Sequence, residues 1–201
     1  MTRQHPTAGL DIAELVERAR DGDARAFEAL VNRYKDRIYS YVSRMLHDPI
    51  EAEDIAQETF VRAFQSLPHF RGASSLQTWL YRIASNLVID SVRRQKRRED
   101  NALSLDAPVD TDDGDMQREL ADERRGPAEL AESSVIQEEV RSAVARISPK
   151  LRPVLVMYDL QGMSYQEIAE ILGCPLGTVK SRLFNARAQL KEQLEGRLGQ
   201  L

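Results

Sequence analysis

Residues 163–182 read MSYQEIAEILGCPLGTVKSR, and the fold of the C-terminal third of the chain follows from this stretch. Ser164, followed three residues later by Glu167, is a capping box that satisfies backbone N–H groups at the start of a helix. Gly173 lies where that helix has to end in a left-handed residue, and Pro175 prevents the helix from continuing. The pattern therefore predicts two helices joined by a tight turn, a helix-turn-helix.

The second helix of this pair has chemically different sides. Its apolar residues recur at spacings of four, three and four, as expected for a stripe that packs against the rest of a domain. They are Val179, Leu183, Ala186 and Leu190. The other sides carry hydroxyl, amide and basic groups, which suit a helix lying in the major groove of DNA. They are Thr178, Lys180, Ser181, Arg182, Asn185 and Arg187. The alternative is an ordinary helical hairpin whose charged side faces water.

Length and composition exclude some classes of protein. The chain has 201 residues, enough for one large domain or two small ones. No stretch approaches the roughly 18 consecutive apolar residues of a membrane helix, and residues 1–11 lack the apolar centre of a signal peptide. The single cysteine, Cys174, rules out an internal disulfide and is typical of a reducing compartment. We therefore expect a cytoplasmic protein that is not itself a membrane protein.

The charged residues are unevenly distributed along the chain. The net charge is −4, from 28 basic and 32 acidic residues. Residues 99–132 hold twelve of the acidic residues and three of the basic ones, which leaves 25 basic and 20 acidic residues for the rest. The two parts that flank this acidic segment are therefore mildly basic, as a DNA-binding protein requires.

The remaining elements are also predicted to be helical. Asp11, Asp23 and Asp48 are suited to cap the first three helices of the N-terminal part. The four helices expected there span about 11–21, 23–46, 48–67 and 75–97, and two more are expected between 134 and 162. The predicted fold is all-α, with two small helical domains joined by a flexible acidic linker and the helix-turn-helix in the second domain. The expected boundaries are 1–98 for the first domain, 99–133 for the linker and 134–201 for the second domain.

The linker is predicted from its composition. After residue 98 apolar periodicity weakens and Asp, Gly and Pro accumulate, as is typical of disordered chain. About 35 residues of random coil span roughly 33 Å and can stretch further, whereas two turns of DNA measure about 70 Å. The linker can therefore let the two domains occupy separate sites on one duplex. A simple solvated spacer explains the same composition.

The third predicted helix has two faces. The residues that can point inward together are Ile55, Thr59, Phe60, Ala63, Phe64 and Leu67. The outer side carries carboxylates and amides, namely Glu51, Asp54, Gln57, Glu58 and Gln65. Such a face on an otherwise basic domain suits a positively charged protein partner. It is also what a solvated helix N-terminus favours, because the helix dipole stabilises acidic residues there.

The fourth predicted helix and the loop before it combine aromatic and basic residues. Its expected core stripe is Leu76, Leu80, Ile83 and Leu87, and other positions carry Trp79, Tyr81, Arg82, Asn86 and the basic run 93–98. Rings on which unstacked bases can stack, with cations that hold phosphates, describe a surface for single-stranded DNA. Alternatively, the cations stabilise the end of the helix and Trp79 belongs to the core.

Three motifs resemble one family. Residues 51–64, EAEDIAQETFVRAF, resemble the core-polymerase-binding region of bacterial sigma factors. Residues 70–72, FRG, followed by TWLYRIASN at 78–86, resemble the promoter-melting region of the extracytoplasmic-function (ECF) group, and residues 173–182 resemble the promoter-recognition domain of that group. The resemblance covers about residues 11–98 and 134–195, in the same order. It indicates an ECF sigma factor of the sigma-E and sigma-W type.

The resemblance implies roles for individual residues. The residues implied to bind core polymerase are Asp54, Gln57 and Glu58. Those implied at the minus-ten promoter element are His69, Phe70, Arg71, Asn86, Arg93, Arg94, Lys96 and Arg97. Asn86 and the loop 69–75 are expected to capture a base flipped out of the opening duplex. Those implied at the minus-thirty-five element, in the helix-turn-helix 164–183 and just after it, are Thr178, Lys180, Ser181, Arg182, Phe184 and Arg187. Phe184 can meet either DNA or the core of its own domain.

The implied function is promoter-specific transcription initiation with core RNA polymerase, as part of an extracytoplasmic or stress response. The implied inhibitor is an anti-sigma factor linked to the membrane. We expect no enzymatic activity, no cofactor and no metal site, because the chain has no phosphate-binding loop and its three histidines are scattered. Two alternatives stay open: a regulator that dimerises on a palindromic operator, and an adaptor that binds polymerase without directing initiation.

Overall fold

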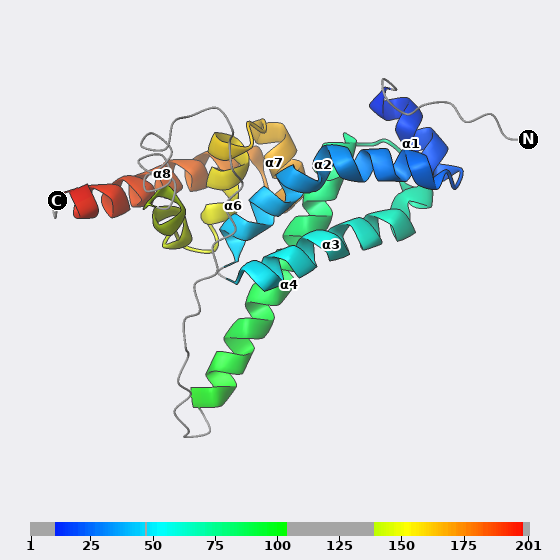
Figure 1. The fold of residues 1–201 in the computed structure, drawn as a ribbon. Helices are drawn as coiled ribbons and strands as arrows, with labels where there is room; N and C mark the ends of the chain where they lie inside the picture. The colour runs from blue at the N-terminus through cyan, green and yellow to red at the C-terminus, as the bar shows by residue number, and fades with distance from the viewer. Residues whose placement is uncertain (1–10, 47, 104–138, 199–201) are drawn as a thin grey trace, which may run out of the picture.

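The computed structural model describes residues 11–46, 48–103 and 139–198. Within these residues all regular elements are helical, which confirms the all-α prediction (Figure 1). The first part holds α1 (Ile12–Arg20), α2 (Ala24–Met45), α3 (Pro49–Ser66), the 3-10 helix η1 (Leu67–His69) and α4 (Leu76–Leu103). The second holds a helical segment at 139–145, α6 (Arg152–Leu155), the π-helix η2 (Val156–Leu160), α7 (Tyr165–Leu172) and α8 (Leu176–Leu198). No helix in the described ranges is long and apolar enough to cross a membrane.

The predicted aspartate caps begin the first three helices. Asp11 accepts a hydrogen bond from the backbone N–H of Ile12, and Asp23 accepts from the backbone N–H groups of residues 25 and 26. Asp48 accepts from Ile50 N–H at 2.8 Å, with Pro49 in the first turn of α3. Each cap satisfies N–H groups that have no partner inside the helix. The starts of these helices are therefore fixed by neighbouring residues in the sequence.

The fourth helix is longer than predicted. It was expected to end near Arg97, but α4 continues to Leu103 and so includes the first five residues of the predicted linker. No glycine or proline occurs between residues 73 and 107, so nothing in the backbone stops the helix at the basic run. Figure 1 shows the C-terminal half of α4 projecting away from the other helices. The rest of the predicted linker, 104–133, lies outside the described residues.

The helix-turn-helix forms as predicted. The side chain of Ser164 accepts a hydrogen bond from Glu167 N–H, and the carboxylate of Glu167 accepts one from Ser164 N–H at 2.8 Å, which completes the capping box. Gly173 ends α7 in the left-handed region, with φ 59° and ψ 39°. In α8, Val179, Leu183 and Ala186 are buried, so the predicted stripe does face the domain.

Two side chains lie where the periodicity did not place them. Phe64 was grouped with the inward residues of α3, but 52% of it is exposed. It stands at the edge of the apolar stripe, with its ring edge-on to Phe27 at 5.0 Å. Tyr81 was left outside the core stripe of α4, but it is fully buried. Its ring packs against that of Tyr41 on α2, with centroids 5.2 Å apart, and its hydroxyl donates a hydrogen bond to Gln161 of the second domain.

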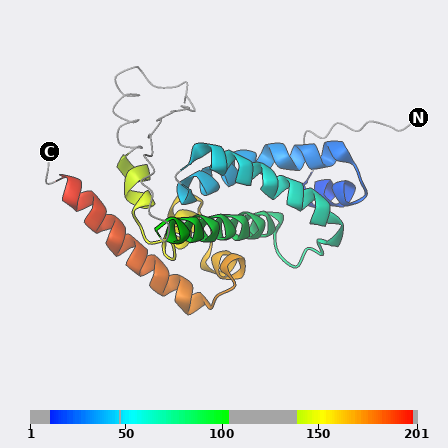
Figure 2. The same cartoon turned by 90° about the horizontal axis from the view of Figure 1, so that it is seen from below.

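The two domains are in contact. In Figure 2, α4 lies between α3 on one side and the α7–α8 pair on the other. Arg152 at the start of α6 donates a hydrogen bond of 2.8 Å to the carbonyl of Met45, at the end of α2. Contacts of this kind join residues far apart in the sequence, and the pattern of the sequence did not predict them.

Candidate nucleic-acid and protein interfaces

The outer face of α3 carries the residues implied to bind polymerase. Asp54 and Gln57 are exposed, and Glu58 is half-exposed. The carboxylate of Glu58 forms an ion pair of 2.7 Å with Arg62, one turn along the helix. Because both partners are about half in water, this pair contributes little to stability. The face is therefore accessible, and its negative charge is only partly compensated.

Sequence reasoning missed the apolar part of this face. Val61 is 49% exposed and Phe64 is 52% exposed. The helix carries Asp54, Gln57, Val61 and Phe64 at successive spacings of three, four and three. All four therefore lie along one side of α3. We call this side the α3 strip (Asp54, Gln57, Glu58, Val61 and Phe64). The spacing could have revealed it, but an aromatic residue near a core stripe is more simply taken as core.

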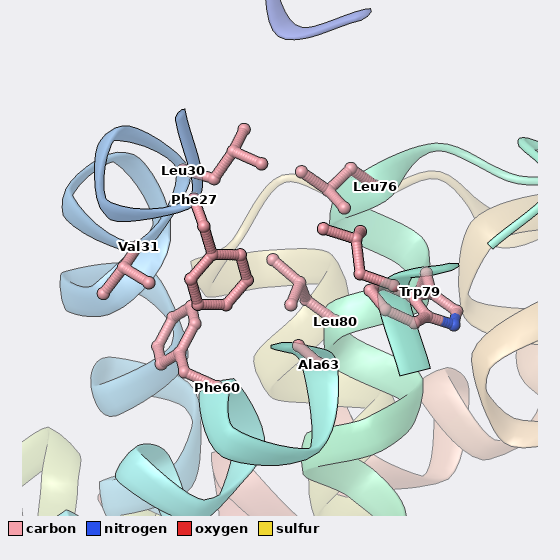
Figure 3. Close-up of a pocket in the computed structure, with 9 residues that line it drawn as sticks. Phe27, Leu30, Val31, Phe60, Ala63, Leu76, Trp79 and Leu80 are labelled. Carbon is pink, nitrogen blue, oxygen red and sulfur yellow. The ribbon is translucent and has the colours of Figure 1, made fainter. Parts of the chain in front are cut away.

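The core behind the α3 strip is closely packed. A narrow apolar gap of about 10 Å³ lies between α2, α3 and α4, lined by Phe27, Leu30, Val31, Phe60, Ala63, Leu67, Leu76, Trp79 and Leu80. Figure 3 shows the labelled side chains of α2, α3 and α4 around this gap. A gap of this size holds about one water molecule at most, and its lining offers no polar partner. The gap is a small packing defect and not a ligand site.

An open pocket lies where α3, η1 and α4 meet. Its volume is about 400 Å³, and it is lined by Arg62, Gln65, Ser66, His69, Ile83 and Asn86. The resemblance implied one shared role for Asn86 and the loop that begins at His69, and both residues line this pocket. Arg62, Gln65 and Ser66 were not predicted for this site, although their spacing of three and one puts them on one side of α3. The pocket combines hydrogen-bond donors, acceptors and one cation around an apolar side chain.

The other residues implied at the minus-ten element lie around this pocket. Phe70 does not line it: its ring packs against that of Trp79, with centroids 4.8 Å apart. Trp79 is partly buried against the core, which agrees with the alternative that this residue belongs to the core. Arg71 is exposed in the loop. The basic residues of α4 are also exposed, and they begin about 10 Å beyond Asn86 along the helix. They are Arg93, Arg94, Lys96 and Arg97.

The outer face of α8 presents the remaining predicted residues. Lys180, Ser181 and Arg187 are exposed, while Thr178 and Arg182 are half-exposed. Phe184 is 75% exposed, so its ring points to solvent and not into the core of the domain. A ring of this size with so little cover is available to a partner.

Neighbouring helices hold two of these cations. The side chain of Asp159 accepts two hydrogen bonds from Arg187, one of them 3.0 Å long, and this partner raises the pKa of Arg187. Arg187 also lies 5.3 Å from the ring centre of Tyr158, and Lys180 lies 5.9 Å from that of Tyr165. The two tyrosine rings stack with centroids 4.7 Å apart. No pattern in the sequence predicted this arrangement, because η2, α7 and α8 each contribute part of it.

Comparison with known proteins agrees with this division into two parts. The family model for sigma-70 region 2 matches residues 30–98, and the model for sigma-70 region 4 matches residues 137–190. Region 2 thus covers α3, the pocket and the basic part of α4. Region 4 covers the helix-turn-helix.

Full-length relatives match over most of the chain. RNA polymerase sigma-H factor of Pseudomonas aeruginosa is 36% identical over 186 residues, which are 90% of this chain and 93% of the relative. The ECF RNA polymerase sigma factor SigW of Bacillus subtilis is 36% identical over 91% of this chain and 96% of its own. CnrH, solved in complex with the cytosolic domain of CnrY, is 25% identical with a TM-score of 0.65, over 92% of this chain and 99% of its own. This chain therefore belongs to the extracytoplasmic-function sigma factors of RNA polymerase.

Proposed function

We propose that this sigma factor binds core RNA polymerase through the α3 strip. The supporting observation is that carboxylates, an amide and two half-exposed apolar side chains share one face of a helix whose other face is closely packed. Apolar groups supply binding energy when a partner covers them, and the acidic groups select a basic partner. Asp54, Gln57 and Glu58 provide the polar contacts, with Val61 and Phe64 at the apolar end.

The pocket beside η1 is proposed to receive a base of the minus-ten element. Taking a base out of the duplex costs a few kcal/mol, so the pocket has to return that energy through contacts with the base. His69 and Asn86 are placed to form hydrogen bonds there, and Ile83 offers an apolar wall. Arg71 and the basic residues at 93–97 would hold the adjoining phosphates. Phe70 acts indirectly, by fixing the loop against Trp79.

The face of α8 is proposed to read the minus-thirty-five element. In a helix-turn-helix the second helix lies in the major groove and the first crosses the backbone. Thr178, Ser181 and Arg182 are placed to contact base edges, and Lys180 is placed to contact phosphate. Phe184 can pack against a thymine methyl group. Arg187 is held by Asp159, so we assign it to orienting this surface before DNA arrives.

The wider setting of the protein is also a proposal. Because polymerase and chromosomal DNA are cytoplasmic, we infer that the chain works in the cytoplasm. The proposed division has a first domain at 1–98, a linker at 99–133 and a second domain at 134–201. The first domain would then engage the minus-ten element and the second the minus-thirty-five element. CnrH is bound to the cytosolic domain of CnrY, and by analogy we propose that an anti-sigma factor linked to the membrane holds this chain inactive until an extracytoplasmic or stress signal arrives.

Run-off transcription tests the central proposal. Core polymerase alone should give no specific transcript, and core polymerase with this chain should start at defined promoters from a genomic fragment library. The triple variant Asp54→Ala, Gln57→Ala, Glu58→Ala should lose most of the transcript and bind core polymerase more weakly. A double variant on the exposed side of α2, Asn32→Ala with Asp36→Ala, is the matched control and should behave as wild type.

The alternatives predict different results. An adaptor would bind core polymerase without any start site, and a dimeric regulator would bind a palindromic operator in the absence of polymerase. Unchanged core binding by the triple variant would refute the role of the α3 strip. Start sites that do not change when the chain is added would refute the promoter-directing role.

A further inference from the structure

Asn185 lies on the most outward side of α8, although none of the proposed contacts with the minus-thirty-five element involves it. Ser181 and Asn185 each follow a buried residue, Val179 and Leu183, by two positions. An α-helix turns about 100° per residue, so both lie about 200° around α8 from the buried stripe. Both are exposed. In a helix-turn-helix whose second helix enters the major groove, this outward side faces the base edges.

The residues around Asn185 leave space for DNA. Gly177, Ser181, Asn185 and Ala188 follow one another at spacings of four, four and three, so they lie along one side of α8. Apart from Asn185 these residues are small, and a Cβ at Gly177 would meet no atom within 4 Å. A side with small residues lets the helix backbone approach the base pairs closely. A side chain as short as that of Asn185 can then reach a base edge.

The side-chain amide of Asn185 has no partner among the described residues of the protein. Polar neighbours on α8 are already engaged, since Ser181 donates a hydrogen bond of 3.1 Å to the carbonyl of Thr178 and Arg187 is held by Asp159. Asparagine is also a weak helix former, so its presence inside a long helix is unfavourable. No contact of the amide with the described residues offsets this cost. Such a side chain is suited to act on an external ligand.

The chemistry of the amide favours one base. A carboxamide places one hydrogen-bond acceptor and one donor side by side in a plane. In the major groove adenine presents the complementary pair, the N7 acceptor beside the N6 donor, and asparagine binds it through two hydrogen bonds. Guanine presents two acceptors, N7 and O6, and suits the paired donors of arginine. The amide of Asn185 is therefore matched to adenine and not to guanine.

The exposed ring of Phe184 is compatible with the same choice. Phe184 directly precedes Asn185 and is 75% exposed. Because consecutive residues are about 100° apart, the ring and the amide lie on either side of the line through Ser181 and Ala188. An A·T pair presents both an adenine edge and a thymine methyl group in the major groove. The ring and the amide can therefore contact A·T pairs next to each other in the groove.

We propose that Asn185 is a specificity-determining residue, which selects adenine at one position of the minus-thirty-five element through hydrogen bonds to N6 and N7. This inference rests on the proposed reading of that element by α8. A guanidinium at position 185 offers two donors to the same base edge. Asn185→Arg should therefore change the preferred base from adenine to guanine, an exchange that a merely structural role for Asn185 would not produce.

Selection from duplex libraries tests this assignment. The full chain alone is given random duplexes, and the chain with core polymerase is given a promoter mapped by run-off and randomised in its minus-thirty-five element. Wild type should enrich adenine at one position about 5- to 150-fold over the other bases. Asn185→Ala should lose that preference, and Asn185→Arg should enrich guanine there. Both variants introduce better helix formers, so the fold should persist. Asn32→Arg, exposed on α2, makes the same substitution elsewhere and should leave every base preference unchanged.

The two selections separate the possible failures. Asn185→Ala that weakens binding equally on all sequences would indicate a phosphate contact and overturn the proposal, as would Asn185→Arg that enriches no guanine. A chain that selects adenine through Asn185 but never initiates with core polymerase refutes the promoter role alone. A chain that initiates, with base preferences that both variants leave unchanged, refutes the adenine contact alone. A wild-type chain that enriches no sequence in either selection refutes both.

Discussion

Truncation of Phe64 to alanine tests the apolar part of the α3 strip. An aromatic side chain can bury about 150–250 Å², and 52% of Phe64 is exposed. Polymerase can therefore cover about 100 Å² of this ring. At about 25 cal/mol per Å² that area corresponds to about 2.5 kcal/mol, or about 70-fold in Kd. Because a surface ring is rarely covered completely, we expect Phe64→Ala to weaken core binding by about 10- to 70-fold.

The assay for Phe64 has to separate binding from folding. The affinity can be measured by fluorescence anisotropy, with a dye on the half-exposed Cys174 and core polymerase as titrant. Phe64→Ala also loses the edge contact with Phe27, so its thermal unfolding is measured in parallel. Val61→Ala, which leaves that contact intact, should give a smaller loss of affinity. Ile89→Ala, at an exposed apolar position on α4, should have no effect. A folded Phe64→Ala variant that binds core polymerase within about twofold of wild type would refute the reasoning.

Three further predictions concern the turn, the groove and the tyrosines. Gly173→Ala should destabilise the chain by about 1 kcal/mol, because a left-handed φ is strained for alanine even with no atom within 4 Å of its Cβ. Helical Gly177→Ala should stabilise it by about 0.5 kcal/mol, and thermal midpoints that move in the same direction would contradict this. Lys180→Ala should reduce the salt dependence of binding to minus-thirty-five duplex, lowering the slope by about 0.9 for one lost phosphate contact; an unchanged slope would exclude that contact. Folded Tyr81 ionises near pH 12 and an unfolded tyrosine near 10. Stability is therefore complete below about pH 10 and falls as the pH rises to about 12, and Tyr81→Phe should reduce this fall in urea midpoints.

The local elements could be predicted because their causes lie within a few residues. Asp23 caps α2 through the N–H groups of the next two or three residues, and Ser164 and Glu167 cap α7 in the same way. The buried stripe of α8 follows from helical periodicity alone. The end of α4 was misjudged because a change in composition was taken for the end of a helix, although no residue there breaks one.

The candidate sites were predicted only in part. His69 and Asn86 came from motifs, but their meeting in one pocket with Arg62 depends on how α3 and α4 pack. Phe64 was misplaced because a residue at the edge of an apolar stripe satisfies the periodicity whether it is covered or not. Whether such a residue is covered depends on the neighbouring helix. In this protein Phe27 of α2 contacts only one side of the Phe64 ring.

The sequence by itself determined the helices, the helix-turn-helix and the polar faces, since hydrogen bonds within one or two turns and the helical repeat are local properties. Only the tertiary structure decided which faces are covered. Tyr81 donates a hydrogen bond to Gln161, 80 residues away, and Arg152 donates one to a carbonyl 107 residues away. No periodicity spans such separations, and the free energy of packing depends on shapes and charges that meet only after folding. The helix-turn-helix is therefore recognisable in the sequence, but the contact of its first helix, α7, with α4 is visible only in three dimensions.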